Sequence, residues 1–186
     1  MFKSNLLLAI LCFLVLGISY GENSNPYYDP SKTHHTREGF TNPYLDDQKE
    51  NKSFGDLINM IMEDRPDEDE IKKKNVTVFT MDDLANAPQR FAVWGGHSTM
   101  LVVLEGKLIL TDPILSEYCS PVQFAGPKRY TPPAIDKDVL NMVDLVLISH
   151  NHYDHLDYNT VMLIGNHAQW IVPLGLKQWF KEQGIY

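Results

Sequence analysis

The segment His150–His155 places four potential metal ligands in six consecutive positions, with the sequence His-Asn-His-Tyr-Asp-His. His150 and His152 are two residues apart, so in an extended segment both side chains project to the same side and can share one cation. Asp154 and His155 follow where the chain turns and can bind a neighbouring cation. Imidazole nitrogen combined with carboxylate oxygen suits zinc better than iron, manganese or nickel. The spacing therefore predicts a site for two metal ions side by side.

Residues 143–149, which precede this segment, are predicted to form the strand that positions it. They form the run Val-Asp-Leu-Val-Leu-Ile-Ser, and an apolar run with β-branched residues that ends in polar ones indicates a buried strand. The plain alternative is a polar, histidine-rich turn that follows a core strand and binds nothing. Four potential ligands in six positions favour the metal site over that turn.

The pattern around this strand predicts a mixed α/β sandwich. Further strands are predicted at Val76–Thr80, Arg90–Trp94, Met100–Leu104, Leu108–Thr111 and Gln169–Val172. Helices are predicted at Asp136–Met142, Tyr158–Ile164 and Leu174–Gln183. Glu105–Lys107 reads as a tight hairpin connection, and Ile114–Ile135 as a long loop of the kind that often forms a functional lid or wall. Strands that come first in hairpins and then alternate with helices are typical of such a sandwich.

The first 75 residues predict two segments outside this domain. Residues 1–21 combine an early lysine with an apolar run, which is typical of a secretory signal peptide; an uncleaved signal anchor is the alternative. Residues 22–75 predict a polar arm with a short amphipathic helix from Phe54 to Arg65, whose apolar stripe can pack on the domain or rest on a membrane. The folded domain would cover residues 76–186. We expect a protein that is secreted or lumenal in the secretory pathway, with membrane association as a further option.

Composition limits the range of partners. A length of 186 residues suits one ordinary domain, and 44% hydrophobic with 22% charged residues is typical of a globular protein. The formal net charge of -8 argues against a general affinity for nucleic acid, so no nucleic-acid partner is expected. The oligomeric state is not indicated.

The segment from His150 to Asp157 resembles the signature of the metallo-β-lactamase superfamily of metallohydrolases. Other motifs narrow the resemblance to the branch of N-acylphosphatidylethanolamine-hydrolysing phospholipase D enzymes and their bacterial relatives. These motifs are Trp94-Gly95-Gly96-His97-Ser98-Thr99, Leu110-Thr111-Asp112-Pro113, Gly126-Pro127-Lys128-Arg129-Tyr130 and Val172-Pro173-Leu174-Gly175-Leu176. The resemblance covers residues 91–184 and implies the N-terminal half of an αββα sandwich.

The resemblance also implies a role for each ligand. His150 and His152 would bind a first zinc ion, and Asp154 and His155 would bind a second. Two such ions, about 3.5–4 Å apart, lower the pKa of water between them toward neutral, and Asp154 would help to position that water. The implied reaction cleaves a phosphodiester in an N-acylated ethanolamine phospholipid and releases N-acylethanolamine and phosphatidic acid. A phospholipid substrate and a membrane surface are therefore the expected partners.

Four residues outside the ligand segment are expected to support the site or the substrate. Asp112 closes a predicted strand and can accept the free N–H of a ligand histidine, although Asp before Pro113 is also a common turn former. His97 follows two glycines that allow close backbone approach, and we expect it to line the cleft or support the site without binding metal. Lys128 and Arg129 lie on the long loop and can attract a lipid phosphate, but exposed basic residues are often only solvated.

The family's remaining metal ligands, two histidines and a bridging aspartate, would lie beyond Tyr186. The expectation is therefore a fragment or a truncated product, with apolar strand faces left without a partner layer. Three activities stay open. They are hydrolysis of the N-acylated phospholipid, hydrolysis of another ester, lactone or phosphodiester, and a non-catalytic role in binding lipid or a full-length relative.

Overall fold

The computed structural model describes residues 25–44, 76–124 and 126–186. The chain divides into two compact units, Met1–Pro66 and Asp67–Tyr186. The signal peptide predicted at residues 1–21 and the amphipathic helix predicted within residues 54–65 lie outside the described residues. Within the described ranges, no helix has the length and apolar character needed to cross a membrane.

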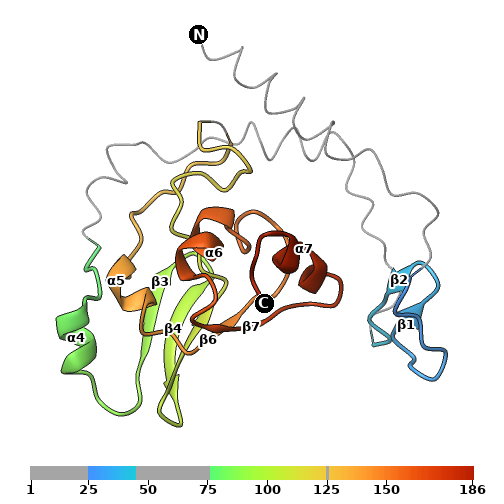
Figure 1. Cartoon of the computed structure of the whole chain (residues 1–186), viewed down its shortest axis with the longest axis horizontal. Coiled ribbons are helices and arrows are strands. Elements are labelled where there is room, and N and C mark those ends of the chain that lie inside the picture. Colours follow the sequence, from blue (N-terminus) through green and yellow to red (C-terminus); the bar gives the residue numbers. More distant parts are fainter. Residues whose placement is uncertain (1–24, 45–75, 125) are drawn as a thin grey trace. The chain divides into compact units, whose positions relative to one another are not determined.

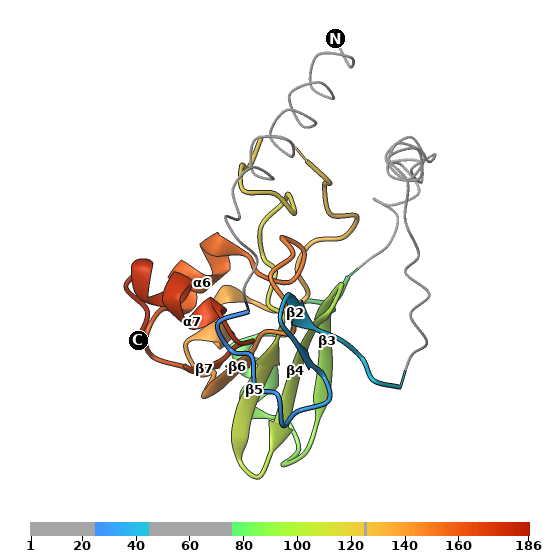
Figure 2. The same ribbon diagram turned by 90° about the vertical axis from the view of Figure 1, so that its right-hand side faces the viewer.

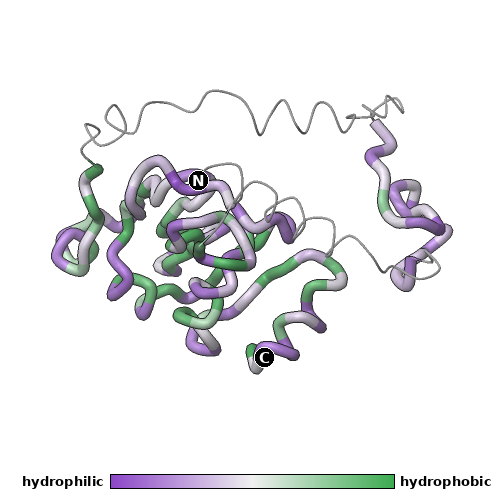
Figure 3. Tube along the Cα trace, turned by 90° about the horizontal axis from the view of Figure 1, so that it is seen from above, coloured by the Kyte–Doolittle hydropathy of each residue, from purple (hydrophilic) through white to green (hydrophobic). Residues whose placement is uncertain are grey.

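In the first unit, residues 25–44 contain a small hairpin. Its strands β1 (His35–Thr36) and β2 (Gly39–Phe40) pair antiparallel. The amide of Asn25 closes the hairpin by donating to two of its backbone carbonyl oxygens at 3.1 and 2.8 Å. This segment is largely hydrophilic, whereas hydrophobic stretches run through the second unit (Figure 3). The described part of the predicted polar arm is therefore held by local hydrogen bonds rather than by an apolar core.

A five-stranded sheet in the order β3-β4-β5-β6-β7 forms the centre of the second unit (Figure 1). Its strands are β3 (Ala92–Gly96), β4 (Thr99–Leu104), β5 (Lys107–Thr111), β6 (Leu145–Leu147) and β7 (Gln169–Ile171). Strands β3 to β5 pair antiparallel, and β6 and β7 continue the sheet in parallel. Glu105 and Gly106 join β4 to β5 with φ of 50 and 77, as a two-residue type I′ hairpin turn requires.

Short helices accompany the sheet, and polar side chains cap the first turn of three of those in the described residues. They are α4 (Met81–Ala85), α5 (Lys137–Leu140), α6 (Tyr158–Ile164) and α7 (Leu176–Glu182). Thr80 and Asp83 form a capping box at α4, while Asp136 and Asp157 cap α5 and α6 by accepting a backbone N–H. Helices α6 and α7 lie beside β6 and β7 (Figure 2).

The two faces of the sheet differ in burial. Leu101 and Leu110 are 0% exposed and belong to the core cluster formed with apolar residues of α5, α6 and α7. Val102, Ile109 and Leu145 are register partners across three strands, and they alternate with the buried residues, so they lie on the opposite face. All three are only half-buried. Within the described structure, helices therefore cover one face of an otherwise apolar sheet.

The predicted fold class is confirmed, because a five-stranded sheet with helices is consistent with half of a metallo-β-lactamase sandwich. The helix predicted at Tyr158–Ile164 is confirmed. The helices predicted at Asp136–Met142 and Leu174–Gln183 and most of the strands are present, with boundaries shifted by at most two residues. The strand predicted at Val76–Thr80 is wrong. Phe79 forms only an isolated bridge with Ile135, and Thr80 caps α4 instead, because its side chain satisfies the free backbone N–H of Asp83.

Candidate metal centre

The predicted ligand segment lies in a turn shortly after β6. The backbone N–H groups of His155 and Leu156 both donate to the carbonyl oxygen of His152, at 2.9 and 2.8 Å. The chain therefore stops running as a strand and folds back within a few residues. As a result, side chains that are up to five positions apart in sequence converge at the end of β6.

His150 and His152 form the first pair of the site. Nε2 of His150 lies 3.1 Å from Nδ1 of His152, and the two ring centroids are 4.5 Å apart. Two nitrogens bound to one tetrahedral zinc at ~2.05 Å are about 3.3 Å apart, the edge of the tetrahedron. The spacing between these nitrogens therefore fits one shared cation, which is the arrangement predicted from the sequence.

A second group contains Asp154, His155 and His97. Oδ2 of Asp154 lies 3.0 Å from Nε2 of His97 and 3.5 Å from Nε2 of His155. One ligand atom from each of the three residues lies within 4.8 Å of the other two. The sequence predicted Asp154 and His155 as a ligand pair, with His97 only in support. His97 comes from the turn between β3 and β4. Its side chain lies as close to Asp154 as a second metal ligand would.

Asp112 lies behind the histidines at the end of β5, where it is 7% exposed. Its Oδ2 is 3.0 Å from Nδ1 of His155, and its Oδ1 accepts the backbone N–H of Ser149 at 2.7 Å. Burial raises the pKa of Asp112, but hydrogen bonds from His155 and Ser149 outweigh this effect and hold the pKa below its ordinary value. A charged carboxylate on Nδ1 leaves Nε2 of His155 as the ligand atom, which is the contact that the predicted supporting role requires.

Ser149 extends this support to His150, and the sequence pattern did not single it out. Its hydroxyl lies 2.7 Å from Oδ2 of Asp112 and 2.8 Å from Nδ1 of His150. A hydroxyl has one proton, so donation to the carboxylate leaves the oxygen to accept Nδ1–H of His150. Partial burial and the neighbouring His155 and His152 lower the pKa of His150, which favours the neutral imidazole that binds metal.

The two basic residues predicted to meet a lipid phosphate have partners within the loop. Nε of Arg129 donates to Thr131 O at 2.6 Å, and its Nη1 donates to Ile114 O at 2.9 Å, so this half-buried side chain holds the loop together. Nζ of Lys128 lies 2.8 Å from Oε1 of Glu117 in an exposed ion pair. A role for either residue in substrate binding stays a prediction.

Asp157 anchors the long loop against α6, a function that the sequence analysis did not predict. Asp157 is 6% exposed, and its carboxylate accepts the backbone N–H groups of Leu115 and Ser116 at 3.2 and 3.0 Å. The hydroxyls of Ser116 and Thr160 donate to it at 2.8 and 2.6 Å. These bonds fix the start of the long loop to Asp157, which lies two residues after His155, the last candidate ligand.

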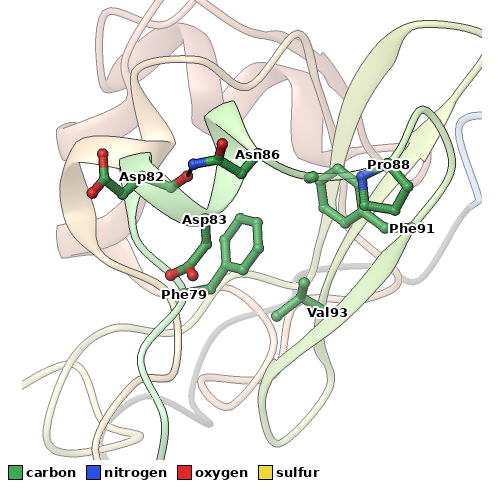
Figure 4. Close-up of a pocket in the computed structure, with 8 residues that line it drawn as sticks. Phe79, Asp82, Asp83, Asn86, Pro88, Phe91 and Val93 are labelled. Carbon is green, nitrogen blue, oxygen red and sulfur yellow. Dashed lines mark hydrogen bonds between the residues drawn. The ribbon is translucent and has the colours of Figure 1, made fainter.

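A separate open pocket of about 480 Å³ lies beside α4. Phe79, Phe91, Val93 and Pro88 form its apolar wall, and Asp82, Asp83 and Asn86 line the helix side (Figure 4). The carboxylate of Asp83 is already engaged in the helix cap, where it accepts the N–H and the hydroxyl of Thr80 at 2.8 and 2.7 Å. None of the lining residues belongs to the candidate metal centre.

The described donors fit a zinc-type cation. Imidazole nitrogens and a carboxylate oxygen are the ligands that zinc takes in proteins, and the atoms lie at separations of 3.0–3.5 Å. Asp112 binds the far nitrogen of His155, which is the usual outer partner of a metal-binding histidine.

Comparison with known proteins places this site in a family context. Residues 107–186 match the family model described as a β-lactamase superfamily domain. The N-acyl-phosphatidylethanolamine-hydrolyzing phospholipase D 1 of Caenorhabditis elegans is 47% identical over 110 residues, which are 58% of this chain and 31% of that protein. The mitochondrial N-acyl-phosphatidylethanolamine-hydrolyzing phospholipase D of Saccharomyces cerevisiae is 34% identical over 50% of this chain and 20% of its own length. A UPF0173 metal-dependent hydrolase of Hyperthermus butylicus is 29% identical over 48% of this chain and 34% of that protein.

The second unit is an α/β domain in which candidate metal ligands converge near the end of β6. These matches confirm the resemblance to the metallo-β-lactamase superfamily that the motifs predicted. Similarity to metal-dependent hydrolases supports a metal cofactor. The chain spans about a third or less of the length of these relatives.

Proposed function

We propose that this chain carries the metal-binding part of a zinc-dependent hydrolase that acts on N-acylphosphatidylethanolamine. The observation that carries the proposal is the convergence of His150, His152, Asp154 and His155 at the end of β6, at ligand-like separations. Two relatives whose names state this activity align with 58% and 50% of the chain. The proposed partners are a phospholipid and the membrane surface in which it resides.

The proposed reaction transfers the phosphatidyl group to water. The water oxygen forms a new bond to phosphorus, the bond from phosphorus to the ethanolamine oxygen breaks, and that oxygen leaves with a proton as N-acylethanolamine. Bound zinc ions would supply positive charge for the phosphate oxygens and make water acidic enough to react at neutral pH. Asp154, whose side chain is 39% exposed beside His97 and His155, can orient the water and accept its proton. Asp112 and Ser149 hold the imidazoles in one tautomer.

The substrate can be tested directly with the purified chain and zinc. Mixed micelles of N-acylphosphatidylethanolamine in ¹⁸O-water should yield N-acylethanolamine without label and phosphatidic acid with one labelled oxygen, measured by mass spectrometry. His152→Ala should abolish both products because it removes half of the first ligand pair, whereas His34→Ala, an exposed histidine in the first unit, should change nothing. Label in the N-acylethanolamine, or turnover that survives His152→Ala, would contradict the proposed chemistry.

A non-catalytic role is the second candidate, and one observation favours it. In the described residues, only His97, Asp154 and His155 form a group of three potential ligands within 4.8 Å, so His150 and His152 remain a pair. Catalytic zinc normally has three protein ligands. Zinc binding and lipid binding without products in the same assay would support this role. Hydrolysis of a different ester or phosphodiester instead would support the broader hydrolase alternative.

A further inference from the structure

We propose that His97 is a third protein ligand of the cation bound by Asp154 and His155. The sequence analysis predicted only a supporting role for His97, because its motif does not coincide with a ligand position of the family that the chain resembles. The inference rests on the proposed metal site but not on the proposed substrate. The inference therefore concerns which residues bind the metal, and it does not depend on which substrate the site hydrolyses.

The distances between donor atoms carry the inference. Nε2 of His97 and Nε2 of His155 lie 3.0 and 3.5 Å from the same oxygen, Oδ2 of Asp154. One ligand atom from each of the three residues lies within 4.8 Å of the other two. The separations of 3.0 and 3.5 Å suit donors that share one cation at ordinary bond lengths of about 2.0–2.2 Å. The rings of His97 and His155 stand edge to face with centroids 5.2 Å apart.

The turn that holds His97 is built to place this side chain. His97 has φ of 49, in the left-handed region that non-glycine residues rarely adopt. The pairing of β3 with β4 shifts register between Trp94 and Gly96, and such irregularities re-aim side chains beside functional sites. The indole N–H of Trp94 donates to the carbonyl oxygen of His97 at 2.8 Å and fixes the backbone.

The two glycines before His97 are required by close packing. A Cβ on Gly95 would lie 2.6 Å from Cδ1 of Ile135, and a Cβ on Gly96 would lie 3.0 Å from Nη2 of Arg129. Gly96 also has φ of 106, a conformation open to glycine at no steric cost. The chain thus keeps an unusual backbone over two successive residues, Gly96 and His97, and unusual backbone tends to persist where function depends on it.

The simpler explanation is a hydrogen bond from His97 to Asp154 with no metal contact. The two side chains are 52% and 39% exposed, and an exposed ion pair stabilises a fold only slightly. Such a pair alone is weak reason to hold a histidine at positive φ. A shared cation accounts for both the contact and the backbone.

Two substitutions separate a ligand from a hydrogen-bond donor. His97→Gln keeps an N–H that can reach Asp154 but removes the imidazole, whereas His97→Cys supplies a thiolate that binds zinc. We expect His97→Gln to weaken one of the bound Zn²⁺ ions by roughly 100-fold or more, beyond the loss usual for an outer partner. We expect His97→Cys to stay within about tenfold of the parent. Titration of the full chain with Zn²⁺ against a chromophoric chelator measures both values.

A spectroscopic measurement makes the contact visible. Co²⁺-loaded His97→Cys should show a thiolate-to-cobalt charge-transfer band that the parent lacks, because Cys119, the free cysteine in the described residues, is common to both proteins. His34→Gln serves as the matched control for the titration, and circular dichroism before metal addition shows that each variant is folded. If His97→Gln binds Zn²⁺ as tightly as the parent, or if His97→Cys lacks the charge-transfer band, the inference about His97 is wrong, whereas the proposed metal site stands. A parent chain that binds no Zn²⁺ overturns the proposed metal site as well.

Discussion

One carboxylate, Asp112, orients histidines in both parts of the candidate centre. It contacts Nδ1 of His155 directly at 3.0 Å and reaches Nδ1 of His150 through the hydroxyl of Ser149. Asp112 itself has φ of 38, a strained value for a residue with a side chain. Both imidazoles are thereby held with Nε2 available, so the tautomers of two ligands depend on a single acidic group.

Substitution of Ser149 tests this dependence at the scale of one hydroxyl. Ser149→Ala keeps the backbone N–H that Asp112 accepts at 2.7 Å but removes the link to His150. We expect about 10–100-fold weaker Zn²⁺ binding, the usual loss when an outer partner of a ligand is removed. Ser149→Thr retains a hydroxyl and should recover most of the affinity in the same chelator competition. Equal affinity in the parent and the alanine variant would show that the hydroxyl does not orient His150.

The sequence predicted part of this site because four ligands stand within six positions. The contact between His97 and Asp154 joins residues 57 positions apart and depends on a bulged, glycine-bearing turn whose direction no local pattern predicts. Ser149 was likewise missed, since a serine after a strand is common and only the position of Asp112 gives its hydroxyl a purpose.

At the scale of elements, Asp157 connects the long loop to α6. An amide cannot replace this carboxylate. In Asp157→Asn an NH₂ group, which is itself a donor, would take the place of one oxygen that accepts hydrogen bonds from Ser116 and Thr160. Leaving a buried donor without an acceptor costs about 1–3 kcal/mol, so we expect the free energy of unfolding in urea to fall by about that amount. Asp138→Asn, at an exposed position in α5, is the matched control and should change stability little. Parallel losses in both variants would contradict the role assigned to Asp157.

The turn between β3 and β4 offers a second test at this scale. Gly95→Ala should lower the free energy of unfolding by about 1–3 kcal/mol through overpacking, because the new methyl would lie 2.6 Å from Cδ1 of Ile135 and 2.8 Å from Cγ2 of Thr99. The double variant Gly95→Ala/Ile135→Val removes the nearer methyl. In urea unfolding, the double variant should lose less free energy of unfolding than the sum of the losses in the two single variants. Strict additivity would mean that the predicted collision does not occur.

Strands were predicted best where β-branched and other apolar residues run continuously. The runs Met100–Leu104 and Leu108–Thr111 indicated β4 and β5, each of which begins one residue earlier in the structure. The run at residues 76–80 has the same composition, but Thr80 and Asp83 satisfy each other's backbone N–H groups and start a helix. Local hydrogen bonds therefore outweighed β propensity, an outcome that composition alone does not decide.

At the scale of the whole molecule, an ion pair beside the sheet links folding to pH. Asp144 precedes β6, and its carboxylate accepts Nζ of Lys107 at 2.6 Å and the backbone N–H of Leu108 at 2.9 Å. These hydrogen bonds lower the pKa of Asp144 below its ordinary value of 3.8, and the bond from Lys107 has the larger effect. A carboxyl whose pKa is lower in the folded state stabilises the fold above the ordinary pKa, and this contribution is lost as pH falls through the folded-state pKa.

The expected result is a stability difference that disappears in acid. Asp144→Asn should be less stable than the parent at pH 7 by about 0.2–1 kcal/mol, the range for a partly exposed pair. Unfolding curves of the two proteins should converge as the pH is lowered below 3.8. Lys107→Met removes the partner and should produce a difference of the same sign at pH 7. A gap that stays constant down to pH 2 would exclude protonation of Asp144 as its source.

Among the residues that the structure describes, no helix covers one face of the sheet. Val102, Ile109 and Leu145 are half-buried register partners on that face, and contiguous exposed apolar surface usually marks a place of contact. We expect the native chain to bind an apolar fluorescent dye such as anilinonaphthalene sulfonate at neutral pH. Ile109→Lys should reduce the fluorescence at least about twofold, since it puts a charge in the middle of the apolar face. Met162→Lys, at a position 44% exposed on α6, should leave the signal unchanged. Because both sites already touch water, neither variant should lose its cooperative urea transition, so a change in dye binding reports on the sheet face itself. Equal fluorescence from all three proteins would mean that the dye finds no apolar surface there, and that other parts of the chain cover the sheet in solution.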